Sequence, residues 1–188
     1  MSALPSHLLG VHAGAVRPLP AAMPGLDYEL TVPQDARRAL ARGWLWLGLL
    51  ALVGSGLFSI LLVLSRTPYV NQWLPAANFF QVSLVLHVDL SVLVWFVAQG
   101  GMLWSIHGTQ RGVRWGWLAL GVAAAGTLAM TLAPFLDRGE PIMANYIPVL
   151  ESPLFLGGLV VFGVGTALLV LRSLLAAPRL GLEYDGRG

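Results

Sequence analysis

Four long apolar stretches constrain this chain more than any other feature of its sequence. They cover residues 43–64, 79–105, 115–135 and 154–171. A helix rises about 1.5 Å per residue and a bilayer core is about 30 Å thick, so each stretch is long enough to cross a membrane. Open strands in lipid would leave backbone groups unpaired, so each stretch is predicted to be helical. The sequence therefore predicts an all-α integral membrane bundle of four transmembrane helices.

The composition supports the same class. Of the 188 residues, 56% are hydrophobic and only 11% are charged, whereas a soluble domain has roughly 25% charged residues. We therefore expect the lipid bilayer to cover much of the surface. The sequence contains no cysteine, which excludes disulfides, thiolate metal sites and iron–sulfur clusters built from these residues.

The arginines predict an orientation. All eleven basic residues are arginine, and most flank the apolar stretches, which favours membrane orientation over nucleic-acid binding. The positive-inside rule then places both termini in the cytoplasm of a multi-pass protein of the cell inner membrane. The arginines on the predicted inner side are Arg37, Arg38, Arg42, Arg111, Arg114, Arg172, Arg179 and Arg187, against Arg66 and Arg138 on the outer side.

The chain outside the helices divides into two predicted segments. Residues 1–36 contain five prolines and no sustained periodicity, so a disordered cytoplasmic arm is expected there. This arm lacks the apolar core of a signal peptide. Asp35 is a plausible N-cap for a helix starting at Ala36. Residues 37–176 form the predicted transmembrane domain, and residues 177–188 a cytoplasmic tail.

His87 and Asp89 are the two strongly polar residues deep in a predicted span. An ionisable group in hydrocarbon costs a few kcal/mol, so it usually faces a bundle interior or a cofactor. At about 1.5 Å per residue, His87 lies roughly 12 Å below the outer face. Asp89 points about 200° away on the helical wheel. For Asp89, two roles remain open: a proton-relay acid, or a packing partner for an Arg or Ser on another chain.

The surroundings of His87 are compatible with a cofactor site. Ser83, His87, Ser91, Trp95 and Gln99 recur every four residues and share one slowly rotating face. The small residues 54–56 and 59 of the first stretch would let a flat group or another helix approach closely. A neutral imidazole here would suit the axial position of a haem iron. A structural hydrogen bond is the competing interpretation.

The sequence around His87 resembles a known protein family. Residues 78–96, Asn-Phe-Phe-Gln-Val-Ser-Leu-Val-Leu-His-Val-Asp-Leu-Ser-Val-Leu-Val-Trp-Phe, resemble the second helix of subunit I of the haem-copper oxidases, the superfamily of terminal cytochrome oxidases and nitric oxide reductases. Residues 139–155 look like the loop entering the fourth helix of one branch. The resemblance runs from about Arg42 to Arg172 and covers the first third of such a subunit.

The resemblance implies a role for His87. In that superfamily the second helix carries one axial histidine of the low-spin haem, so His87 is expected to ligate the iron of a haem b, with Ser83, Ser91 and Trp95 on the same face. Later helices of the family supply the remaining haem and copper ligands. Copper is therefore not expected to bind this chain, and other oxidase subunits are the expected partners. A split, truncated or reduced relative of subunit I fits this pattern.

The sequence is therefore compatible with three functions. The first is a membrane component of a respiratory terminal oxidase that takes part in electron transport but is not active alone. The second is a small dimeric b-type cytochrome, in which two symmetric copies of His87 share one haem. The third is a cofactor-free structural or assembly subunit.

Overall fold

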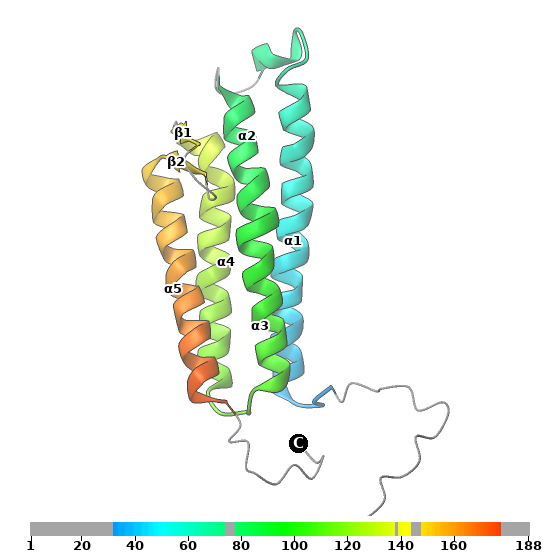
Figure 1. Ribbon diagram of the computed structural model, residues 1–188, viewed down its shortest axis with the longest axis vertical. Helices are drawn as coiled ribbons and strands as arrows, with labels where there is room; N and C mark the ends of the chain where they lie inside the picture. The colour runs from blue at the N-terminus through cyan, green and yellow to red at the C-terminus, as the bar shows by residue number, and fades with distance from the viewer. Residues whose placement is uncertain (1–31, 74–77, 138, 144–147, 178–188) are drawn as a thin grey trace, which may run out of the picture. The chain divides into compact units, whose positions relative to one another are not determined.

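The computed structural model describes residues 32–73, 78–137, 139–143 and 148–177. Helices dominate this part of the chain (Figure 1). Four of them are long and apolar enough to cross a membrane, as predicted. The predicted arm lies almost wholly outside the described residues, as does nearly all of the predicted tail. In chain order the elements are α1 (Ala36–Leu64), the 3₁₀-helix η2 (Val70–Trp73), α2 (Phe79–Val88), the π-helix η3 (Asp89–Val94), α3 (Trp95–His107), α4 (Val113–Leu136), β1 (Glu140–Ile142), β2 (Val149–Glu151) and α5 (Pro153–Leu175).

The second span is continuous but changes its winding. Segments α2, η3 and α3 follow each other without a break and form one span, Phe79–His107. The other three spans are α1, α4 and α5. Each predicted apolar stretch lies inside its observed helix. The helices are longer than these stretches because their polar ends continue the hydrogen-bonded ladder beyond the apolar core.

The starts of α1 and α5 follow from capping residues. The Asp35 side chain accepts a hydrogen bond from the Arg37 amide at 2.8 Å, which confirms the predicted N-cap. Ser152 does the same for the Phe155 amide at 3.2 Å, and Pro153 occupies the first helical position of α5. Both caps satisfy amide groups that have no partner inside their helix.

The outward faces of the helices are apolar. On α1, side chains such as Leu50, Val53, Leu57 and Val63 are more than half exposed. In water such a face would be strongly unfavourable, so lipid must cover it. Tryptophans near the helix ends are also exposed, as an aromatic belt requires. They are Trp46, Trp73, Trp104, Trp115 and Trp117. Trp44 differs from this expectation because it is fully buried.

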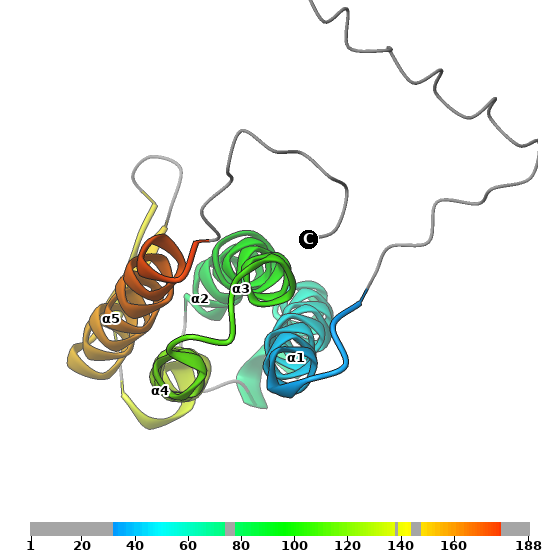
Figure 2. The same cartoon turned by 90° about the horizontal axis from the view of Figure 1, so that it is seen from below.

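Helices α4 and α5 pack side by side (Figures 1 and 2) at very short range. A Cβ atom added to Gly165 would lie within 2.9 Å of backbone atoms of Ala119 and Ala123. A Cβ on Gly158 would lie 2.9 Å from the Met130 amide nitrogen. Helix association in lipid depends on such backbone contact, because lipid tails are as apolar as leucine.

Helix α1 packs against the second span, which runs antiparallel to it (Figures 1 and 2). Trp44 on α1 lies directly over Gly101 on α3, where a Cβ would collide with the indole. Gly48, one turn further along α1, faces Ala98, Gln99 and Trp95. Small residues on both helices thus leave room for large side chains from the other.

A short β-hairpin connects α4 and α5, and it was not predicted. Strands β1 and β2 pair antiparallel, with Pro141 opposite Leu150. Leu150 is 1% exposed and belongs to the hydrophobic core, so the hairpin closes this end of the bundle. Asn78, at the start of α2, donates a hydrogen bond to the Glu140 carboxylate at 3.2 Å.

At the opposite end, the start of α1 is tied to the loop between α3 and α4. The Arg37 guanidinium donates to the Gly108 carbonyl at 2.5 Å and forms an ion pair with Asp35 at 2.9 Å. The Gln110 side-chain amide donates to the same carboxylate at 2.7 Å. The hydrogen bonds from Arg37 and Gln110 lower the pKa of Asp35 well below the usual range of an aspartate.

The α4–α5 contact predicts the effect of enlarging its glycines. Gly165→Leu should destabilise the folded protein by about 1–3 kcal/mol, since the side chain must displace the α4 backbone. Gly163→Leu is the matched control, because nothing lies within 4 Å of a Cβ there. Thermal unfolding in detergent measures both variants. Equal melting temperatures for the two would contradict the close contact.

The Asp35 contacts predict a pH dependence. A carboxyl whose folded-state pKa is lowered stabilises the fold above its unfolded pKa, and this stability is lost as the pH falls through the lowered value. Asp35→Asn should therefore melt below the wild type at neutral pH, with the difference vanishing in strong acid. Glu151→Gln, at an exposed carboxyl, controls for general effects of acid. A difference that persists at low pH would argue against the ionic role of Asp35.

Candidate functional site

His87 lies in the last turn of α2, next to the π-helix, and contacts α1 through Ser55. Its Nδ1 atom is 3.0 Å from the Ser55 carbonyl oxygen and 2.8 Å from the Ser55 hydroxyl oxygen. The Ser55 hydroxyl in turn lies 2.9 Å from the His87 carbonyl oxygen. Two helices are therefore joined by reciprocal contacts between one serine and one histidine.

These contacts define the tautomer of the imidazole. A carbonyl oxygen only accepts hydrogen bonds, so the Nδ1 atom of His87 carries the proton and donates to Ser55. The Ser55 hydroxyl then donates to the His87 carbonyl, which also accepts from the Ser91 hydroxyl at 2.6 Å. The Nε2 atom has no hydrogen-bond partner among the described residues. Its lone pair is left available on a half-buried side chain.

The π-helix η3 begins two residues after His87, at Asp89. Each turn of a π-helix contains more residues than an α-turn, since its hydrogen bonds run from i to i+5, and such segments are frequent at functional sites. The wider turn alters the angular spacing of the residues from Asp89 to Val94. A helical wheel drawn for an ideal α-helix therefore does not apply past Val88.

The predicted face is only partly preserved. Ser83 is fully buried, and its hydroxyl has no hydrogen-bond partner in the described part of the chain. Ser91, Trp95 and Gln99 are half-buried like His87, and Trp95 and Gln99 lie beside Gly48 of α1. His87 thus faces α1 at Ser55, and Trp95 and Gln99 face it about two turns away, at Gly48.

Asp89 is buried in the bundle. It is 1% exposed, and neither carboxyl oxygen has a hydrogen-bond partner among the described residues. The packing partner considered from the sequence would lie on another chain, so it stays a prediction. A buried polar group without a partner is destabilising, and an ionised one much more so.

The small residues of α1 play distinct roles beside His87. Gly54 faces Leu90 of η3 at close range, whereas a Cβ on Gly56 would meet nothing within 4 Å. Ser55 itself is buried. The sequence indicated that this stretch permits close approach, but not that Ser55 fixes the tautomer of His87. In the described residues, no three His, Asp or Glu side chains are grouped closely enough to bind a metal ion.

Comparisons with known proteins give distant relatives. The chain is 29% identical over 160 residues to an uncharacterized protein, RP382, of Rickettsia prowazekii (strain Madrid E), in an alignment covering 72% of this chain and 31% of the relative. It is 28% identical over 131 residues to an uncharacterized protein of Aquifex aeolicus (strain VF5), covering 70% and 33%. The chain thus spans about a third of the length of these relatives. No family model matches it, and no solved structure matches it significantly.

Because the Asp89 carboxyl has no hydrogen-bond partner among the described residues, the effect of removing it can be predicted. Asp89→Val places an apolar side chain of similar size in the same site, and we expect it to raise the stability by about 1–3 kcal/mol. Asp89→Asn is the matched control, because it keeps a polar group that still needs partners. Thermal unfolding of the purified chain in detergent tests this. A lower melting temperature for Asp89→Val would show that the carboxyl has a stabilising partner.

Proposed function

We propose that this chain is a membrane component of a respiratory oxidoreductase and supplies one axial ligand, His87, to a b-type haem. The observation that carries the proposal is the state of the His87 imidazole. Its Nδ1–H is held by the Ser55 carbonyl at 3.0 Å, and its Nε2 lone pair has no partner in the described residues. The resemblance of residues 78–96 to the second helix of haem-copper oxidase subunit I supports the same residue.

The donor set fits a haem iron. Metal-bound histidines almost always donate their other ring N–H to a carbonyl, carboxylate or water, which fixes the ring and raises its basicity. The Ser55 carbonyl takes this role here, and the Ser55 and Ser91 hydroxyls fix the peptide of His87. Gly56, the next residue of α1, is exposed, and a Cβ there would meet nothing within 4 Å. A haem bound at His87 would supply one-electron transfer.

The chain itself provides orientation and electronic tuning. The Ser55 contact holds the imidazole in one rotamer and one tautomer. The ring would therefore need little reorientation if an iron bound to its Nε2 atom changed oxidation state. The surrounding helices provide an apolar environment without bulk water. Trp95 and Gln99 extend the same α1-facing row and are candidates for shaping the edge of the site.

The second axial ligand must come from residues other than those described. His107, the other described histidine, lies at the far end of α3, where its Nδ1 atom is 2.9 Å from the carbonyl of Leu103. We propose that a companion oxidase subunit supplies the remaining haem and copper ligands. The relatives extend well beyond their matched third. The arginine distribution favours an inner-membrane orientation with both termini in the cytoplasm.

Haem binding to His87 predicts a spectroscopic result. The reduced-minus-oxidised spectrum of the purified chain, prepared with the polytopic membrane proteins encoded beside it, should contain a b-type haem signal. His87→Ala should lower the haem content at least tenfold, since the iron loses a ligand. His107→Ala is the matched control and should keep the wild-type content. Circular dichroism establishes that each variant remains helical.

The outcomes separate the three functions. A signal that needs both His87 and a companion protein supports the split-oxidase assignment. A signal from the chain alone would instead assign a dimeric cytochrome. Absence of haem under every condition would contradict the proposal and leave a structural or assembly subunit. Equal haem in His87→Ala and wild type would show that His87 is not the ligand.

A further inference from the structure

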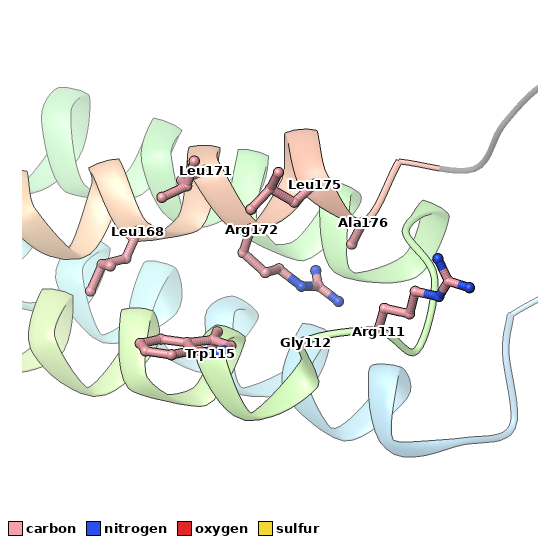
Figure 3. A pocket seen from close by; sticks show the side chains of 8 residues that line it. All are labelled: Arg111, Gly112, Trp115, Leu168, Leu171, Arg172, Leu175 and Ala176. Atoms are coloured by element: carbon pink, nitrogen blue, oxygen red, sulfur yellow. The ribbon is translucent and has the colours of Figure 1, made fainter.

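A pocket of about 380 Å³ lies between α4 and α5 at the arginine-rich end of the bundle. Figure 3 shows Arg172 extending from α5 toward Gly112 at the start of α4, with Trp115 on the α4 side. Gly112 and Arg172 face each other closely, since a Cβ on Gly112 would lie 3.7 Å from the Arg172 side chain. The pocket is unrelated to His87, which lies in another part of the bundle.

Arg172 carries a buried charge that this part of the protein does not neutralise. The residue is 4% exposed. One terminal nitrogen, Nη2, donates to the Thr109 carbonyl at 3.2 Å. The Nε and Nη1 atoms are buried and have no hydrogen-bond partner in the described residues. A guanidinium stays protonated in proteins, and an unpaired buried charge is costly. An anion bound beside Arg172 would therefore be stabilising.

The start of α4 adds further anion-binding groups beside Arg172. Gly112 is the N-cap residue and has a left-handed conformation, with no side-chain cap. The amide groups of Arg114 and Trp115 have no hydrogen-bond acceptor within the described residues. A helix N-terminus carries a partial positive charge and binds phosphate through such amides. Arg111, which also lines the pocket, is exposed and adds a second guanidinium.

The remaining wall of the pocket is apolar. Leu168, Leu171 and Leu175 line it from α5, and the exposed ring of Trp115 lines it from α4 (Figure 3). Both helices are membrane spans that end or begin here, so the pocket lies where lipid headgroups meet acyl chains. An occupant that is anionic at one end and apolar along its length matches this wall.

We propose that this pocket binds an anionic phospholipid, with the phosphate held by Arg172, Arg111 and the start of α4. The acyl chain lies along the α5 leucines and Trp115. Basic pockets between transmembrane helices bind anionic lipid headgroups in this way. A net negative lipid is preferred over a zwitterionic one because, among the residues that the structure describes, the pocket lining holds two guanidinium groups and no carboxylate. The phosphate also satisfies the free nitrogens of Arg172.

The experiment measures lipid binding to the full chain in detergent. Native mass spectrometry and thermal unfolding are recorded with phosphatidylglycerol, phosphatidylcholine or inorganic phosphate. We expect phosphatidylglycerol to bind more tightly than phosphatidylcholine and to raise the melting temperature, with no effect of free phosphate. Arg172→Gln should weaken phosphatidylglycerol binding at least tenfold, as expected for lost charged hydrogen bonds. Arg111→Gln, at an exposed position that the fold does not need, should weaken it about fivefold.

Controls keep the proposal testable if Arg172→Gln does not fold. Arg66→Gln changes an exposed arginine at the opposite end and should leave binding unchanged. Unchanged phosphatidylglycerol affinity in folded Arg111→Gln would overturn the proposal, as would equal affinity for phosphatidylcholine. An equal shift with inorganic phosphate would assign a free-anion site instead. If Glu183→Gln with Asp185→Asn destabilises lipid-free protein as much as Arg172→Gln does, a carboxylate of this chain, and not a lipid, is the partner of Arg172.

Discussion

Close contact between helix backbones is the constraint on which this bundle depends. Lipid removes the hydrophobic driving force between helices, so the spans associate through van der Waals contact and hydrogen bonds. On one side, Gly158 and Gly165 of α5 touch the backbone of α4. On the other, Gly48 and Gly101 accommodate large side chains where α1 crosses the second span. Because each contact needs a residue without a side chain at one point, the positions of the glycines select which helix faces meet.

The same close packing fixes the orientation of the His87 imidazole. The imidazole reaches the Ser55 carbonyl at 3.0 Å only because α1 and the second span approach closely there. A carbonyl oxygen has two lone pairs, so the Ser55 carbonyl can accept from the imidazole and also keep its hydrogen bond within α1. The π-helix begins at Asp89, which is buried, whereas His87 is half-buried and contacts Ser55 of α1. The tautomer of His87 therefore depends on the close packing of α1 against the second span.

The features of this structure that follow from composition could be predicted from the sequence. The features that depend on contacts between its helices could not. The four spans were predictable because length and hydropathy alone determine them. His87 was conspicuous because an ionisable group in an apolar helix is rare. The π-helix could not be predicted, since a helical wheel assumes a constant turn. The β-hairpin has strands of three residues, too short for an alternating pattern. In the sequence Arg172 is one of several flanking arginines, and its burial depends on the approach of the α3–α4 loop and the start of α4.

Several polar groups in the described part of the bundle lack hydrogen-bond partners, and three of them differ in how they can be reached. The His87 ring is half-buried, and its Nε2 atom has no hydrogen-bond partner among the described residues. Arg172 is buried, but its free donors line a pocket at the end of two spans, where the proposed lipid headgroup can reach them. Asp89 is 1% exposed, and its carboxyl oxygens have no partner in the described residues. Accessibility, more than polarity, therefore separates the two candidate sites from Asp89.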